Sequence, residues 1–245
     1  TFGDGKFVVV GGSGIILTSS DGTKWSRKSS PSTLSLYGLT FGNGIFVAVG
    51  DNGLILTSPD GSIWTPQASP DIARLYCVTY GNGTFVAAGG KVYTSPDGIA
   101  WTPKATPLYG LWGATFANNI FALVGYNGIM TSPDGDTWKV SSNEGYQGVT
   151  FANNTFVAVG GFSRIATSSD AITWTMREPH FTIQGLSSVT YGRNRFVAVW
   201  GEYDGATATS PDGITWTQSI HTEHPLSGVA YGNDTFVAVG YRGTI

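Results

Sequence analysis

The sequence has little cysteine, little charge and no long apolar run. Cys77 is the only cysteine among 245 residues, which excludes an internal disulfide and a zinc site built from thiolates. Charged residues make up 12% of the chain, about half the usual globular share of roughly 25%. The net charge of −3 and the scattered Lys and Arg leave no basic stripe for a nucleic acid. No run of 18 apolar residues exists, so we expect no membrane-spanning segment.

What the chain has in abundance is glycine, at 35 residues, and aromatic side chains, at 13%. This is the profile of many short strands joined by tight turns, and the length suits one large all-β domain. Cys77 stands at a repeat position that otherwise holds glycine or serine, so we interpret it as a small buried residue.

One phrase of about 39 residues recurs along the whole chain, and it reads roughly GVTYGNGTFVAVG…ILTSPDGITWT. Self-similarity at a fixed period is the signature of repeat architectures. No linker interrupts the series, which predicts a single domain over residues 1–245. The repeats begin near positions 1, 40, 79, 115, 150, 190 and 230.

Four strand signals are present in each complete repeat, as in LSGVAYG, TFVAVG, ATATS and ITWTQS. Asn43-Gly44 and Asn82-Gly83 suit a tight hairpin between the first two strands, because both residue types tolerate positive φ. Four strands per 40 residues predict a β-propeller blade. The main alternative is a β-solenoid, whose coils have shorter periods and need no hairpin turns.

The segment between the third and fourth strands occurs six times in register, ending at a tryptophan each time, as in SPDGSIW at Trp64 and SPDGITW at Trp216. It resembles the Asp-box (BNR-like) repeat of sialidases, sortilin-type receptors, some glucanases and photosystem-assembly propellers. The fifth copy departs from the pattern, since Ala171 replaces the glycine.

We interpret the motif as a hairpin device in which the carboxylate accepts backbone N–H bonds within its own turn. The tryptophans should pack between blades. The six aspartates are therefore structural Asp-box residues and not catalytic acids: Asp21, Asp60, Asp97, Asp134, Asp170 and Asp212.

The first two strands occur seven times but the Asp-box only six times. Because the first strand lines the channel, we predict seven blades of four antiparallel strands, the last blade incomplete. A six-bladed ring would leave the apolar residues of 226–245 uncovered. Residues upstream of Thr1 would have to complete the last blade; otherwise its exposed edge is a candidate contact for self-association.

Alternating hairpins place the first-to-second and third-to-fourth links on one face, where the turns are nearly identical. The remaining links share the opposite face and differ in length and chemistry, so we expect a ligand there, with repeats 4 to 7 the richer side. The candidate ligand-binding residues are Tyr126, Tyr146, Phe162, Arg164, Tyr203, Tyr241, Arg242 and Trp112.

The three histidines lie on two neighbouring links of that face. HxxH in a loop lacks the helical register of a zinc protease, so His180, His221 and His224 are only weak metal candidates and we expect no cofactor.

Three classes of function remain. The arginines stand in no sialidase-type motif, and few carboxylates are left for a glycosidase once the Asp-box aspartates are set aside, which disfavours an enzyme. We expect a non-catalytic module that binds a carbohydrate or protein ligand on the variable face. The alternatives are a structural subunit of a larger extracellular assembly and a glycoside-active enzyme. Low charge with abundant Ser, Thr and Gly fits a secreted or cell-surface protein.

Overall fold

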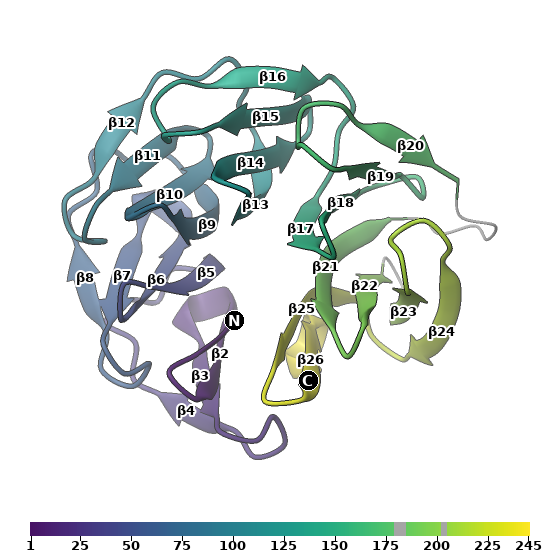
Figure 1. The fold of residues 1–245 in the computed structure, drawn as a ribbon. Helices are drawn as coiled ribbons and strands as arrows, with labels where there is room; N and C mark the ends of the chain where they lie inside the picture. The colour runs from purple at the N-terminus through teal and green to yellow at the C-terminus, as the bar shows by residue number, and fades with distance from the viewer. Residues whose placement is uncertain (179–184, 202–204) are drawn as a thin grey trace.

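The computed structural model describes residues 1–178, 185–201 and 205–245, without the side chains of 219–221. Its regular structure is β-strand, apart from three single-turn 3-10 helices: η1 (Gly12–Gly14), η2 (Asp51–Gly53) and η3 (Tyr241–Gly243). The strands form antiparallel sheets arranged in a ring around a central channel (Figure 1). No helix in the described ranges is long and apolar enough to cross a membrane.

Six sheets have four strands each, and we number them blade 1 to blade 6 in chain order. A seventh, two-stranded sheet is called the C-terminal hairpin. The strands, sheet by sheet, are β1 (Phe2–Gly3), β2 (Lys6–Val10), β3 (Ile16–Ser19) and β4 (Ser26–Lys28); β5 (Leu36–Gly42), β6 (Ile45–Gly50), β7 (Ile55–Ser58) and β8 (Thr65–Gln67); β9 (Leu75–Gly81), β10 (Thr84–Gly89), β11 (Val92–Ser95) and β12 (Thr102–Lys104); β13 (Leu111–Ala117), β14 (Ile120–Gly125), β15 (Gly128–Ser132) and β16 (Lys139–Ser142); β17 (Gly148–Ala152), β18 (Thr155–Val159), β19 (Ile165–Ser168) and β20 (Thr175–Arg177); β21 (Leu186–Gly192), β22 (Arg195–Gly201), β23 (Gly205–Ser210) and β24 (Thr217–Thr222); β25 (Leu226–Gly232) and β26 (Thr235–Gly240).

The prediction of seven four-stranded blades is wrong: the described residues form six such blades, and the seventh repeat contributes only the C-terminal hairpin. The prediction counted first strands, whereas a blade also needs an outer pair of strands, and that pair occurs six times. The argument that a six-bladed ring would leave the hairpin uncovered also fails. β25 packs along β21 on one side and against β1 on the other, so both neighbours cover the hairpin.

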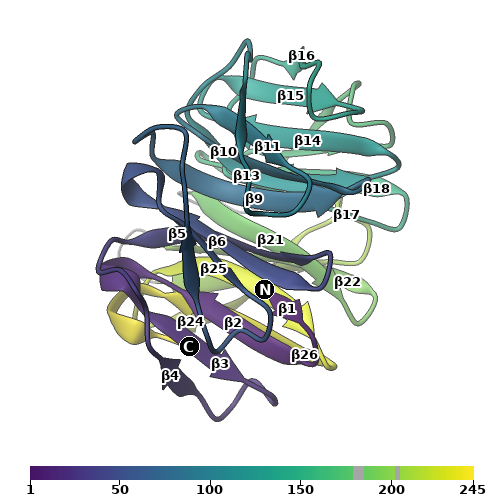
Figure 2. The same cartoon turned by 90° about the vertical axis from the view of Figure 1, so that its left-hand side faces the viewer.

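Specific contacts hold the hairpin between blades 6 and 1. On the blade 6 side, the Val229 amide donates to Ser188 Oγ at 3.3 Å. On the blade 1 side, Asn233 Nδ2 donates to the Ser20 carbonyl at 3.3 Å. Gly232 leaves room for a ring there, since a Cβ atom would lie 2.1 Å from Cγ of Phe2. Figure 2 shows the N-terminal strands and the hairpin side by side.

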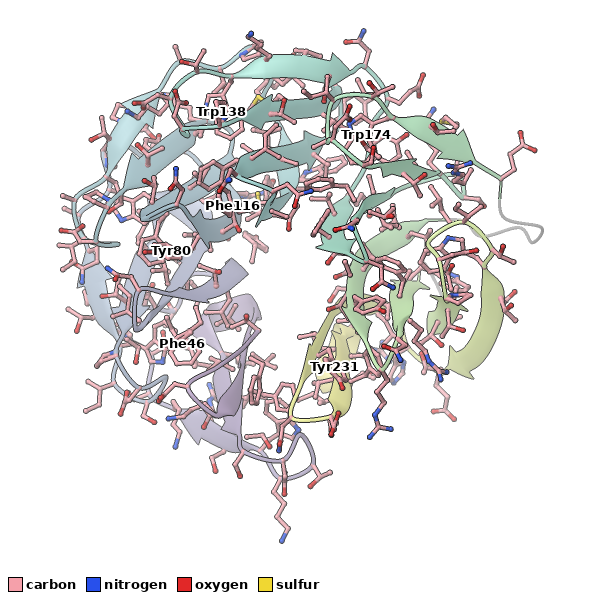
Figure 3. All side chains as sticks on the ribbon, in the orientation of Figure 1. Phe46, Tyr80, Phe116, Trp138, Trp174 and Tyr231 are labelled. Carbon is pink, nitrogen blue, oxygen red and sulfur yellow. The ribbon has the colours of Figure 1, made fainter. Side chains whose placement is uncertain are left out.

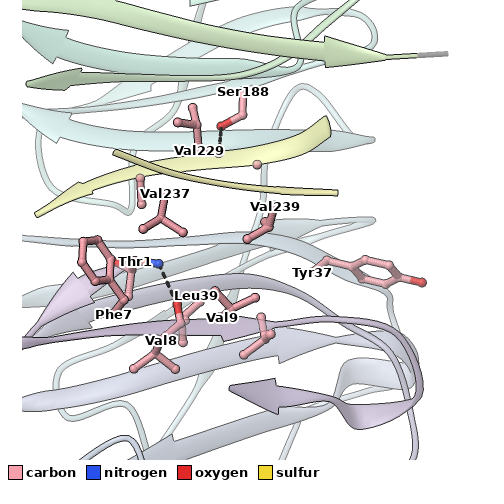
Figure 4. Close-up of a pocket in the computed structure, with 13 residues that line it drawn as sticks. Thr1, Phe7, Val8, Val9, Tyr37, Leu39, Ser188, Val229, Val237 and Val239 are labelled. Carbon is pink, nitrogen blue, oxygen red and sulfur yellow. Dashed lines mark hydrogen bonds between the residues drawn. The ribbon is translucent and has the colours of Figure 1, made fainter. Parts of the chain in front are cut away.

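A cavity of about 170 Å³ remains at this junction, and Figure 4 shows its lining. Valine side chains from both sheets face it, including Val8, Val237 and Val239. The Val8 amide donates to the Thr1 carbonyl at 2.9 Å beside this cavity. The junction is therefore less completely filled than the interior of the blades.

The hydrophobic core lies between neighbouring blades, because both faces of each second strand are buried. In β6, Phe46 and Ala48 pack with residues of blade 1, whereas Val47 and Val49 pack with residues of blade 3. The phrase T-F-V-A-V-G thus fills two cores at once, as expected of a strand buried on both sides. Figure 3 shows aromatic side chains, among them Trp138 and Trp174, at intervals around the ring.

The near-identical turns of one face are tight hairpins and Asp turns, the latter being residues 19–25, 58–64, 95–101, 132–138, 168–174 and 210–216. In the hairpins, Asn43 (φ 49°) and Gly44 (φ 75°) adopt the predicted left-handed conformation. In the second Asp turn, the Asp60 carboxylate accepts the amide N–H groups of Ser62 and Ile63 at 2.8 and 3.0 Å.

The tryptophan at the end of the Asp turn adds a hydrogen bond to the turn and a packing contact with the neighbouring blade. Trp64 Nε1 donates to the Gly61 carbonyl at 3.0 Å, and the ring packs with Val8 and Ile16 of the preceding blade. In this turn the aspartate thus accepts backbone N–H groups of its own turn, and the tryptophan packs between two blades.

Candidate binding site

The variable face carries the links between second and third strands and the links between blades. The residues of these links differ from repeat to repeat, whereas the turns of the opposite face are nearly identical. Five aromatic or aliphatic side chains project from it with more than half of their surface exposed: Ile72 (80%), Tyr109 (68%), Tyr126 (71%), Phe162 (86%) and Tyr241 (65%). The Asp turns of the opposite face also expose Ile63 (72%), Ile99 (54%) and Ile172 (56%), so the geometry of the channel mouth decides where a ligand fits.

At the mouth of the central channel, β-bulges in five of the described inner strands each present one residue. The pairing of β5 with β6 shifts between Leu36 and Gly38, which leaves Tyr37 as the extra residue, and the same shift singles out Tyr76 and Trp112. In β21 and β25 the bulged residues are Ser187 and Ser227. A bulge turns a side chain away from the regular alternation of a strand.

These bulged residues, with Gln147 of blade 5, line a pocket of about 240 Å³ at the channel mouth. One side of the mouth is aromatic (Tyr37, Tyr76 and Trp112), and the other is polar (Gln147, Ser187 and Ser227). A mouth divided in this way can contact an apolar surface of a ligand and hydrogen-bond its polar groups.

Small residues form the floor of the pocket one step further along each inner strand. A Cβ atom at Gly38 would lie 2.8 Å from Cα of Cys77, and one at Gly113 would lie 2.7 Å from the Gln147 carbonyl oxygen. The inner strands therefore approach each other closely just below the mouth. Cys77 is buried, and its burial raises the pKa of its thiol to about 12, as expected of a packing residue.

The second and third blades together build a polar cluster on the aromatic side. Tyr37 and Tyr76 lie 5.3 Å apart between ring centroids, and the guanidinium carbon of Arg74 lies 5.9 Å from each ring. Arg74 Nε pairs with Asp51 Oδ1 at 2.5 Å, and the Tyr37 hydroxyl donates to Asp51 Oδ2 at 3.1 Å. Desolvation, followed by the bond to Asp51, raises the pKa of Tyr37, so the phenol stays protonated.

Trp112 extends the aromatic side toward blade 4. Its ring meets Tyr126 edge to face, with centroids 6.1 Å apart. We call Tyr37, Tyr76, Trp112 and Tyr126 the aromatic crescent. It joins residues that lie up to 89 positions apart in the sequence, and it covers three successive blades.

The structure brings only two of the predicted ligand-binding residues, Trp112 and Tyr126, into the crescent. Phe162 stands at the tip of the β18–β19 link with φ 57°, an unusual conformation for a bulky residue. Arg164 pairs with Glu144 at 3.4 Å. Arg242 lies over the ring of Tyr241 at 5.8 Å, near the C-terminal hairpin.

Tyr146 differs from the other predicted residues because it is buried, with 1% of its surface exposed. Its hydroxyl donates to Met176 Sδ at 3.6 Å, and its ring packs with Val124, Ile129 and Val149. A side chain in this position supports the core and offers no ring face to a ligand.

Two of the residues singled out from the sequence, Tyr203 and His180, lie outside the described residues, as does the side chain of His221. His224 is described, and its carbonyl accepts a bond from Thr222 Oγ1 at 2.8 Å. Within the described ranges no three His, Cys, Asp or Glu side chains gather as a metal site would require.

The sequence did not single out Tyr37, Tyr76 or Arg74 as residues of the variable face. The predicted residues came from the links, mostly those of repeats 4 to 7, whereas Tyr37 and Tyr76 belong to the inner strands β5 and β9. A signal was present: the tripeptides LYG, LYC and LWG occupy the same repeat position that holds LSS and LSG in later repeats. Aligning that position would have revealed an aromatic residue where others have serine.

No family model and no curated protein matches this chain. Solved structures do match it. A structure of YCF48 from Cyanidioschyzon merolae is 15% identical with a TM-score of 0.73, over 99% of this chain and 92% of that one. A structure described as YCF48 bound to D1 peptide is 18% identical with a TM-score of 0.71, over 96% of this chain and 86% of that one.

The WD40 β-propeller domain of Doa1 is 13% identical with a TM-score of 0.72, over 98% of this chain and 86% of that domain. At these identities the matches show the fold alone, which is a β-propeller.

Proposed function

We propose that this propeller is a non-catalytic binding module built from Asp-box repeats, and that it binds a peptide segment of a protein partner at the channel mouth. The observation that carries the proposal is the aromatic crescent. Three of its aromatic side chains, each from a different blade, line one mouth and are turned out of their strands by bulges, and the fourth, Tyr126, packs against Trp112. Aromatic residues dominate the energy of protein recognition sites.

Two further observations support a binding function over catalysis. The Asp-turn carboxylates are occupied by backbone N–H groups on the opposite face, so they are committed to the fold. The pocket at the mouth combines aromatic and polar residues from several inner strands, which suits a ligand that contacts more than one blade. One of the structures similar to this chain, at 18% identity, is a YCF48 bound to a peptide.

The proposal is tested with a random 12-residue peptide library displayed on phage, panned against the wild-type chain. We expect enriched peptides whose binding falls at least about tenfold in the Tyr76→Ala and Trp112→Ala variants, the loss typical of an interface anchor. The matched control is Tyr109→Ala, an aromatic residue of the same face outside the crescent.

Equal losses in the control, or enriched peptides that ignore the crescent, would refute the assignment of the site. A glycan array run beside the library examines the carbohydrate alternative. Glycan binding that depends on Tyr76 and Trp112, without peptide binding, would replace the peptide ligand by a sugar. No ligand in either screen would favour the structural-subunit alternative.

A further inference from the structure

Arg74 is the one cation that the described part of the structure places over the crescent, and its position is fixed from several sides. Asp51 pairs with its Nε atom at 2.5 Å. Its Nη1 atom donates to the Tyr76 hydroxyl at 3.3 Å, and that bond heads the causes that raise its pKa. The rings of Tyr37 and Tyr76 both lie 5.9 Å from its guanidinium carbon. The charge is therefore permanent and oriented.

These contacts leave N–H groups of Arg74 that can donate hydrogen bonds to a ligand at the channel mouth. A guanidinium has five N–H groups. The Nη1 group of Arg74 bonds the Tyr76 hydroxyl, whereas the contact with Asp51 Oδ1 is an ion pair without hydrogen-bond geometry. The side chain is 54% exposed, so solvent and ligands reach it. A carboxylate is the group that best matches the fork of an arginine, because two parallel N–H···O bonds form at once.

We infer that Arg74 is a carboxylate-binding subsite within the crescent and that the ligand is an acidic peptide. The inference rests on the proposed function and specifies its ligand. The guanidinium lies over both tyrosine rings, with its carbon 5.9 Å from each centroid, and the two rings are tilted by 46°. A sugar ring needs a free, flat aromatic face, whereas a peptide side chain fits between tilted rings.

The test uses peptides selected from the library by the wild-type chain, resynthesised with each Asp or Glu changed to its amide. We expect acidic residues to be enriched, and the acidic peptide to bind about tenfold more tightly than its amide twin, as for a charge-assisted hydrogen bond. The Arg74→Gln variant should bind both peptides as weakly as wild type binds the amide twin. A structural role for Arg74 would instead weaken both peptides further.

Arg242→Gln is the matched control, because Arg242 also lies over a tyrosine ring on this face. It should keep the tenfold preference. Peptides with a free and an amidated C-terminus separate a side-chain carboxylate from a chain-terminal one. The inference is overturned if selected peptides lack acidic residues, or if Arg242→Gln removes the preference as fully as Arg74→Gln. Peptide binding that depends on Tyr76 but shows no acid preference would retain the proposed function and remove only this subsite.

Discussion

Ala171 and Ala122 share one buried cluster with Phe156, and each departs from its repeat in a way that compensates the other. Ala171 stands where the other five Asp turns have glycine. Ala122 stands where the equivalent strands have valine, as in Val47 and Val157. At the other junctions a Cβ on the glycine would press on that valine, at 2.7 Å for Gly213 and Val157. At this junction the methyl group of Ala171 occupies the volume that is left because Ala122 stands in place of a valine.

This relationship predicts strong coupling between positions 122 and 171. Ala122→Val alone should destabilise the fold by about 1–3 kcal/mol, because the added methyl groups overpack against Ala171. Ala171→Gly alone should change stability little, since the relief of a left-handed alanine (φ 62°) offsets the lost contact. The double variant Ala122→Val/Ala171→Gly should recover most of the loss of the first variant. Urea unfolding of the four proteins measures the coupling free energy. Additive changes in the free energy of unfolding would show that the two positions do not compensate each other in volume.

A second prediction compares the contributions of the serine and the aspartate of an Asp turn to stability. Ser210 is fully buried and accepts the buried Gly213 N–H at 2.8 Å, whereas the two N–H groups bonded to Asp212 are exposed. Water can replace the aspartate but not the serine. Ser210→Ala should therefore cost about 1–3 kcal/mol, and Asp212→Ala about 0.5–1.5 kcal/mol. Chemical denaturation gives both values, with Ile214→Ala as the surface control. A larger loss in Asp212→Ala would reverse this order.

Repetition made much of the fold predictable from the sequence. The four-strand repeat, the Asn-Gly hairpins and the Asp turns depend on contacts within about 40 residues, and all are visible in the repeat phrase. The number of complete blades could not be predicted in this way. The hairpin of residues 226–240 is stabilised by contacts with β21 and with β1, and β1 lies at the opposite end of the chain. No local pattern reports that Asn233 meets Ser20.

The candidate site was predicted only to the level of a face. Trp112 and Tyr126 were recognised as aromatic residues of the variable side, but Tyr37 and Tyr76 look like ordinary strand residues in the sequence. Their exposure depends on β-bulges, and a bulge is a property of pairing between two strands. Tyr146 shows the opposite case: a link residue that tertiary packing buries against Met176.

The thiol of Cys77 provides a third prediction. Its burial raises its pKa to about 12, and its Sγ donates to the Ala88 carbonyl at 3.7 Å. The thiolate is the reactive form, so native protein at pH 8 should react with a disulfide reagent at least about 100-fold more slowly than the urea-unfolded chain. Absorbance of the released thiolate gives both rates. Rapid labelling of the folded protein would mean that the channel floor opens.

Acid should destabilise the ring through its Asp turns, and Asp134 shows the sign of the effect. The amide groups of Thr137 and Asp136 bond its carboxylate and lower its pKa to about 2. In the unfolded chain an aspartate has a pKa of about 3.9. Because the folded state holds the ionised form more strongly, its stabilisation is complete above pH 4 and is lost as the pH falls toward 2.

The Asp134→Asn variant isolates this effect, because an amide oxygen can accept the same two N–H bonds but does not titrate in this range. We expect the melting temperature of wild type to fall between pH 4 and pH 2, and the fall to be smaller in the variant. Glu223→Gln, at an exposed position on the other face, should fall as much as wild type. Parallel curves for all three proteins would show that carboxylates elsewhere control acid unfolding. Since five other turns hold aspartate in the same way, Asp→Asn changes in several turns should flatten the curve progressively.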